Sequence, residues 1–203
     1  PGAQKLGARF KVRGYPTMIV FTPEGAEITR LPGEADAPQV MQTLQLALSR
    51  GRPVAQVLQD AKAGKPVSAN EWKMLAFYSW DTDQDQLVSE ADRAALLGQL
   101  AGKAPAGEAA VAQRLWLKAL ANSDDGKGIR SDDALREKVR GWLADPAVAR
   151  ANADVLTNSA REITRALESE PGPERNAVLA SFEAALKRLQ ADTSLSRADR
   201  MTA

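Results

Sequence analysis

The sequence predicts a small α+β part, a β-hairpin with flanking helices, followed by a longer part that is mostly α-helical. Two observations support this fold class. Residues 18–31 join two strand-like runs through a proline–glycine turn, which is the pattern of an antiparallel hairpin. After residue 50, apolar residues recur at helical spacing in successive segments bounded by capping residues, glycine or proline. We therefore expect two domains, residues 1–50 and residues 51–203.

The first helix is expected over residues 3–12 and ends before the turn at Gly14. Pro16 follows this turn. Proline cannot donate a ladder hydrogen bond, so it marks either the first position of a strand or a bend. The Tyr15–Pro16 peptide bond is a candidate for the cis isomer, because X–Pro bonds adopt it far more readily than other peptide bonds.

Two strands come next. Residues 18–21 form a continuous apolar run, typical of a strand buried on both faces. The turn at residues 22–25 leads into residues 26–31, which alternate and are expected to form a less buried strand near the sheet edge, with the stem of Arg30 beside Ile28. An amphipathic helix is then expected from Asp36, a candidate N-cap, to about residue 50.

These residues resemble the thioredoxin superfamily. The likeness lies in the pattern Val12-x-Gly14-x-Pro16-Thr17, followed by an apolar strand, a glycine turn, a second strand, Gly33 and an amphipathic helix. Several matched positions in order are more specific than a lone proline or glycine pair. The resemblance implies that residues 1–50 are the C-terminal half of a thioredoxin-like α/β domain. The alternative is an unrelated hairpin packed on helices.

The resemblance also implies a substrate groove at Tyr15, Pro16 and Thr17. In the family, the proline at the position of Pro16 is cis and lies beside the redox-active Cys-x-x-Cys. The residue at the position of Tyr15 offers backbone groups to an extended substrate chain. Most relatives carry a smaller or β-branched residue there, so the shape of the groove stays open, and an ordinary half-buried aromatic is the alternative for Tyr15.

The chain contains no cysteine and no histidine. Ser-His-Asp and Cys-His catalysis, the usual zinc sites, haem ligation by histidine and iron–sulfur clusters are thereby excluded from these residues. The family's chemistry, attack of a thiolate on a disulfide, is excluded as well. We therefore expect no catalytic residue, no metal ligand and no cofactor here.

The resemblance places the redox cysteines outside this chain, in a parent thiol:disulfide oxidoreductase. Its substrate would be a protein or peptide that carries a thiol or disulfide, and this chain alone should be redox-inactive. The alternative is a redox-inactive thioredoxin-fold scaffold or helical interaction module. The long helical extension favours a bacterial periplasmic protein over a cytoplasmic one.

Charge and hydropathy limit the other partners. The 27 Lys and Arg residues nearly balance the 26 Asp and Glu residues, and the two signs are interspersed, which argues against nucleic-acid binding. No apolar run approaches the roughly 18 residues of a membrane span. We expect neither a nucleic-acid partner nor a membrane span.

Residues 51–203 are expected to form seven or so helices with short connections, arranged as antiparallel hairpins that offer a surface to a substrate or protein partner. A stacked solenoid and an irregular bundle both fit. A single long helix is expected from Asp145 to Leu167. The helix starts are indicated by capping residues or by proline in the first turn, at Pro53, Ser68, Ser89, Ser131 and Pro146.

Two clusters in the helical part have a functional and a structural interpretation. Asp81, Asp83 and Asp85 have the outline of a calcium-binding loop, but Gln86 stands where that loop needs glycine. An acidic loop before a helix capped by Ser89 explains the same residues. The aromatic residues before this loop form either a binding groove or, more commonly, a core: Trp72, Phe77, Tyr78 and Trp80.

Overall fold

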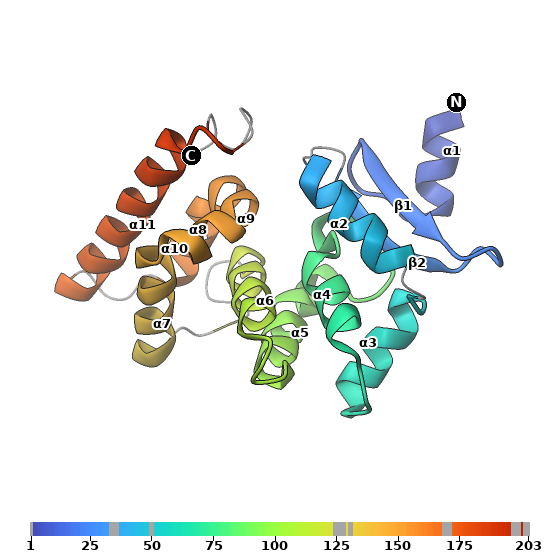
Figure 1. Cartoon of the computed structure of the whole chain (residues 1–203), viewed down its shortest axis with the longest axis horizontal. Helices are drawn as coiled ribbons and strands as arrows, with labels where there is room; N and C mark the ends of the chain where they lie inside the picture. Colours follow the sequence, from blue (N-terminus) through green and yellow to red (C-terminus); the bar gives the residue numbers. More distant parts are fainter. Residues whose placement is uncertain are drawn as a thin grey trace. The chain divides into compact units, whose positions relative to one another are not determined.

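The computed structural model describes residues 2–32, 37–48, 51–123, 129, 132–167, 172–195 and 200. These residues are mostly helical, with one two-stranded antiparallel sheet (Figure 1). The chain divides into two compact units. The first comprises residues 1–93 and 102–112, and the second comprises residues 94–101 and 113–203, so the division runs through two helices.

The elements of the hairpin region are α1 (Gly2–Arg9), β1 (Thr17–Phe21), β2 (Glu27–Pro32) and α2 (Ala37–Leu48). They are followed by α3 (Val54–Ala63), α4 (Ala69–Phe77), the 3-10 turn η1 (Trp80–Thr82), α5 (Glu90–Lys103) and α6 (Ala109–Ala121). The last elements are α7 (Asp133–Ala144), α8 (Pro146–Ala151), α9 (Ala153–Asn158), α10 (Ala160–Leu167) and α11 (Pro173–Ala191).

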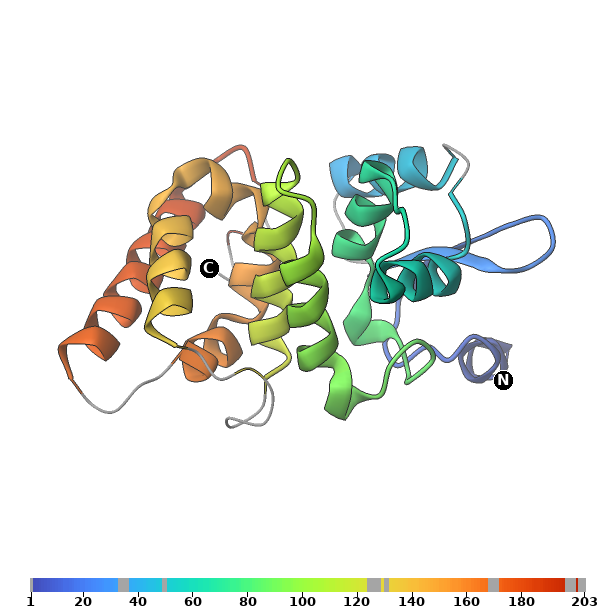
Figure 2. The ribbon, with the colours of Figure 1, turned by 90° about the horizontal axis from the view of Figure 1, so that it is seen from below.

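The expected hairpin is confirmed. Strands β1 and β2 pair antiparallel, from Thr17 opposite Pro32 to Phe21 opposite Glu27. The connecting turn contains Gly25 at a φ of 88°, a left-handed conformation that glycine adopts without steric cost. Figure 2 shows the tip of this hairpin projecting away from the helices of the first unit.

The prediction that the first strand is the more buried of the two is wrong. Strand β1 is the more open one, since Met18 is 41% exposed and residues 19–21 are only partly buried. Strand β2 is buried on both faces, because α2 and α3 pack against it and its side chains alternate between covered surfaces. The apolarity of a strand does not reveal which neighbour covers it. The buried residues of β2 are Ile28, Thr29, Arg30 and Leu31.

The first unit therefore extends beyond the family-like segment. Helix α4 contacts both α2 and α3, so residues after 51 complete the packing around β2. The expected helix start at Ser68 is confirmed: Ser68 caps α4, and Glu71 returns the hydrogen bond to form a capping box. Helix α3 ends at Gly64 in the left-handed conformation. The domain boundary expected between residues 50 and 51 marks the end of the family resemblance, and it stays a prediction.

The second unit is organised around α11. This helix contacts α7, α8, α9 and α10. In a solenoid each repeat contacts only its sequence neighbours, so contacts to four helices favour a bundle within this unit. Its core is apolar and includes Leu120, Val139, Leu143, Leu156, Ile163, Leu167, Val178, Phe182 and Leu189.

The prediction of a single long helix from Asp145 to Leu167 is wrong. Three shorter helices, α8, α9 and α10, replace it, with breaks at Asn152 and Ser159. The chain turns at each break. Apolar residues of all three helices lie in the same core as those of α11. Asp145 caps α8 as expected, through the N–H groups of Ala147 and Val148. Asp132 caps α7, whereas the expected cap, Ser131, lies outside the described residues.

Candidate functional site

The segment between α1 and β1 is the candidate site, and it contains the three residues that the sequence singles out. The Tyr15–Pro16 peptide bond is cis, and both residues are exposed. The hydroxyl of Thr17 donates a 2.6 Å hydrogen bond to the carbonyl of Gly14, which closes a tight turn around the proline. Residues 14–17, hereafter the candidate loop, thus reach solvent at the start of the open strand β1.

Tyr15 lies against α1. A Cβ atom added at Gly7 would lie 1.6 Å from the Tyr15 hydroxyl oxygen, so the absence of a side chain at Gly7 lets the phenol approach the helix. Tyr15 still has 60% of its surface exposed. Part of its aromatic side chain is therefore open to solvent, three residues before the exposed Met18 of β1.

The main chain just before the candidate loop is fixed by the helical region. The N–H of Arg13 donates to the carbonyl of Thr82 at 3.0 Å, and the N–H of Gln84 donates to the carbonyl of Lys11 at 3.0 Å. Val12 and Asp83 form an isolated antiparallel bridge between these two bonds. Residues 11–13 and 82–84 thus behave as a short two-stranded ladder.

Arg30 lies beneath this ladder and is completely buried. Its Nε and Nη2 atoms donate to the two carboxylate oxygens of Glu27, each at 2.7 Å. The other N–H groups donate to main-chain carbonyls: Nη2 to Phe10 at 3.0 Å, and Nη1 to Lys11 at 3.1 Å and Thr82 at 3.0 Å. All five donors of the guanidinium are therefore used.

Tyr78 and Asp83 complete this buried polar cluster. The Tyr78 hydroxyl lies 3.1 Å from Glu27 Oε1 and 3.2 Å from Asp83 Oδ2. Burial, and then the charge of Glu27, raise the pKa of Tyr78 far above its ordinary value, so the phenol stays protonated and can donate. Burial, the largest single influence, lowers the pKa of Arg30, but the hydrogen bonds with Glu27 and the nearby acidic groups together outweigh it, so the pKa of Arg30 is raised.

The acidic loop before α5 uses its carboxylates to hold its own main chain. Asp83 is buried and accepts from the N–H groups of Gln86 and Leu87, at 2.9 and 3.2 Å. Asp85 accepts from the N–H of Glu90 at 2.8 Å, and Ser89 caps α5. Among the residues that the structure describes, no group of three or more acidic side chains is arranged to hold a metal ion.

The aromatic cluster is core rather than groove. Trp72, Tyr78 and Trp80 are buried, whereas Phe77 is partly buried. The Trp80 indole N–H donates to the carbonyl of Leu75 at 3.0 Å. The rings of Tyr78 and Trp80 meet edge to face, with centroids 4.9 Å apart.

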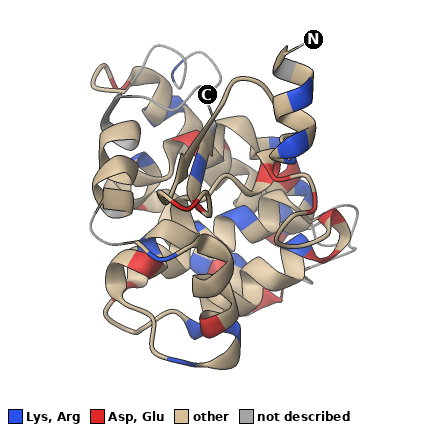
Figure 3. Cartoon of the chain, turned by 90° about the vertical axis from the view of Figure 1, so that its right-hand side faces the viewer, with Lys and Arg blue, Asp and Glu red and all other residues tan. Residues whose placement is uncertain are grey.

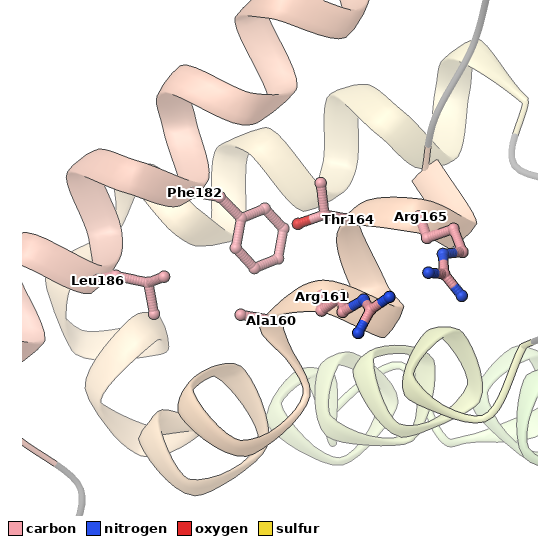
Figure 4. A pocket seen from close by; sticks show the side chains of 6 residues that line it. All are labelled: Ala160, Arg161, Thr164, Arg165, Phe182 and Leu186. Carbon is pink, nitrogen blue, oxygen red and sulfur yellow. The ribbon is translucent and has the colours of Figure 1, made fainter. Parts of the chain in front are cut away.

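A pocket of about 390 Å³ lies between α10 and α11 (Figure 4). Phe182 and Leu186 provide its apolar side, while Arg161 and Arg165 stand on α10 at its rim. It is open to solvent in the described part of the chain. Sequence reasoning did not identify this pocket, because the residues that line it come from two helices whose packing the sequence does not indicate.

Charged residues of the two signs are interspersed along the chain. Figure 3 shows Lys and Arg interspersed with Asp and Glu on the face that it displays. Beside the candidate site, Arg13 forms an exposed ion pair with Glu90, and this hydrogen bond and the charge of Arg13 hold the pKa of Glu90 below its ordinary value. None of the described helices is long and apolar enough to cross a membrane.

Arg30 is the residue of this region that sequence reasoning missed. It was expected to lie on the surface of an edge strand with only its stem covered. The available signal was Glu27 three positions earlier, an acid on the same strand that can pair with Arg30. The remaining partners are carbonyl groups 19 to 52 residues away, which no local pattern indicates.

Comparisons of this chain with protein-family models, with curated proteins and with solved structures gave no match.

Proposed function

We propose that this chain is the substrate-facing part of a thioredoxin-like thiol:disulfide oxidoreductase whose redox cysteines lie outside these residues. The observation that carries the proposal is the exposed Tyr15–Pro16 turn at the start of β1, preceded by α1 and followed by an antiparallel hairpin and α2. The order of these elements is the one that the family resemblance implies.

The candidate loop adjoins a surface suited to an extended chain. Within the described residues β1 pairs only with β2, so the backbone groups along its other edge are available to a further strand or an extended peptide. Tyr15 lies two residues before β1 and Met18 lies within it, and both are exposed. A peptide or further strand that pairs there would place its side chains against an aromatic and a flexible thioether side chain.

The role of this chain in the reaction is binding and orientation. A thiolate from outside these residues attacks one sulfur of the substrate disulfide, forms a mixed disulfide and releases the other sulfur as a thiolate. Tyr15, Pro16 and Thr17 would hold the substrate chain beside that thiolate. The second unit would supply a surface for a substrate or partner, and the periplasm is the proposed compartment, with the cytoplasm as the alternative.

The first test uses the longest natural form of the protein. An intact mass above 21.8 kDa, with thiols found by titration and insulin reduction that alkylation abolishes, supports the proposal.

Replacing Tyr15 by alanine should raise KM for a disulfide-bonded protein several-fold and leave the thiol count unchanged. Met41→Ala, which changes an exposed apolar residue of α2 outside the candidate loop, is the matched control. A protein without a cysteine pair would contradict the proposal.

The second candidate function is a redox-inactive scaffold or helical interaction module. The observation that favours it is the absence of cysteine from the whole chain, together with the open apolar pocket between α10 and α11. A purely helical interaction protein should retain partner binding when residues 1–50 are removed. Loss of partner binding on that deletion, with insulin reduction present in the intact protein, favours the oxidoreductase.

A further inference from the structure

We propose that Arg30 is a positioning residue for the candidate loop and acts through the main chain that precedes it. The guanidinium binds the carbonyls of Phe10 and Lys11, two residues that lie just ahead of the loop, and the carbonyl of Thr82. The proposal rests on the proposed function for its substrate, but its geometric part is independent of that function.

Strand β2 holds the candidate loop at both ends through this one residue. The main chain of Arg30 lies opposite Ile19 in the β1–β2 ladder, which fixes the strand that leaves the loop. Its side chain fixes the segment that enters the loop. A displacement of the guanidinium therefore moves the start of the loop relative to β1, and Tyr15 moves with it.

The helical region takes part in this arrangement. The carbonyl of Thr82 accepts from the N–H of Arg13 as well as from Arg30, and the carbonyl of Lys11 accepts from Gln84 and Arg30. The N–H of Ser79 also donates to the carbonyl of Arg30 at 3.0 Å. Residues 79–84 thus brace the candidate loop, which gives this part of the helical sequence a role at the proposed site.

The burial of the cluster explains why arginine is required. Glu27 is nearly inaccessible, with its side chain 8% exposed, and needs a cation beside it. A lysine would supply the charge but has only three donors on one nitrogen, so it cannot reach Glu27 and all three carbonyls at once. Arg30→Lys therefore keeps the charge balance and removes the positioning.

Arg52→Lys is the matched control. Arg52 lies in the same unit and joins two carboxylates, Asp60 at 2.5 Å and Glu71 at 2.6 Å, but it has no hydrogen bond with residues 10–17. Both substitutions remove a bridging guanidinium. Only Arg30→Lys should release the loop.

Hydrogen exchange measured by mass spectrometry on the full chain tests the geometry. In Arg30→Lys, the amides of residues 11–17 should exchange roughly tenfold faster than in the wild type, as expected when charge-assisted hydrogen bonds are lost. In Arg52→Lys these amides should keep their wild-type rates, while those at the start of α4 exchange faster. Wild-type protection of residues 11–17 in Arg30→Lys overturns the inference.

A second variant covers failure of Arg30→Lys to fold. Tyr78→Phe keeps the guanidinium but removes the hydroxyl that contacts Glu27 and Asp83, so residues 11–17 should exchange faster by a smaller factor. If Arg30→Lys does not fold and Tyr78→Phe leaves this segment at wild-type rates, the inference is overturned.

Kinetics of the full-length protein test the consequence for substrate. Arg30→Lys should raise KM for a disulfide-bonded protein about tenfold and change kcat by less than about twofold, whereas Arg52→Lys should change neither. Unchanged KM in Arg30→Lys overturns the functional part of the inference. A wild-type protein without disulfide exchange contradicts the proposed function instead, and the exchange measurements then decide the role of Arg30.

Discussion

Arg30 shows how a buried charge can organise several segments of a chain. Its guanidinium is paired with Glu27 and also binds three carbonyls, so each of its five N–H donors has an acceptor. A buried charge with unsatisfied hydrogen bonds would cost several kcal/mol. The guanidinium of Arg30 is compatible with burial because each of its N–H groups has an acceptor.

Glu71 provides a residue-scale prediction about pH. Its hydrogen bond with Arg52, aided by bonds from Ser68, lowers the pKa of Glu71 to about 2 against an ordinary value of 4.5. A lowered pKa in the folded state stabilises the fold above pH 4.5, and this contribution is lost as the pH falls toward 2. We expect Glu71→Gln to reduce the loss of stability over this range, measured by urea unfolding at several pH values.

The control for this prediction is Glu24→Gln. Glu24 is exposed at the hairpin turn, so its replacement should leave the acid profile as in the wild type. An unchanged profile in Glu71→Gln would mean that the bridge from Arg52 does not persist in solution.

At the scale of elements, the two strands differ in what covers them. Strand β2 lies beneath α2 and α3, whereas β1 keeps an open edge within the described residues. The apolar run of β1 is therefore partly available to a partner, and β2 carries more of the stability of the first unit.

Paired alanine substitutions test this difference. Leu31→Ala removes a buried side chain of β2 and should cost about 2–5 kcal/mol of unfolding free energy. Met18→Ala, on the open strand, should cost less than about 1 kcal/mol. Urea unfolding followed by circular dichroism measures both. Equal costs would show that β1 is covered in solution.

The break of the expected long helix is also an element-scale result. Helices α8, α9 and α10 each carry apolar residues with helical spacing, so the sequence pattern reads as continuous. The breaks at Asn152 and Ser159 allow successive segments to turn toward α11. At Asn152 the side-chain amide donates to the carbonyl of Val148 at 3.0 Å, which replaces a main-chain donor at the helix end.

At the scale of the whole molecule, the hairpin depends on residues that follow it. Strand β2 needs α3 for cover, and Arg30 needs Thr82 as an acceptor. The family-like segment of residues 1–50 contains neither. A two-stranded hairpin is marginally stable in water without such cover.

Fragments of the chain test this dependence. Residues 1–50 alone should show no cooperative urea transition, whereas residues 1–112, which contain the whole first unit, should unfold cooperatively. Circular dichroism and amide exchange measure both fragments. A protected, cooperative fragment of residues 1–50 would contradict the prediction and favour a boundary at residue 50.

Much of the local structure could be predicted from the sequence. The hairpin, the capping box at Ser68, the caps at Ser89 and Asp145 and the end of α3 at Gly64 all depend on residues within a few positions of each other. Of the candidate site, the exposed turn at Tyr15 could be anticipated, because proline and glycine restrict the main chain wherever they occur.

The sequence by itself determined the existence and type of these elements and the absence of thiol and imidazole chemistry from the chain, because these follow from residue types and local spacing. Only the tertiary structure decided that β2 rather than β1 is buried, that the last part of the chain breaks into short helices, and that Arg30 binds Thr82. These outcomes depend on which surfaces meet across long sequence separations. Periodicity shows that a face is apolar but does not identify its partner.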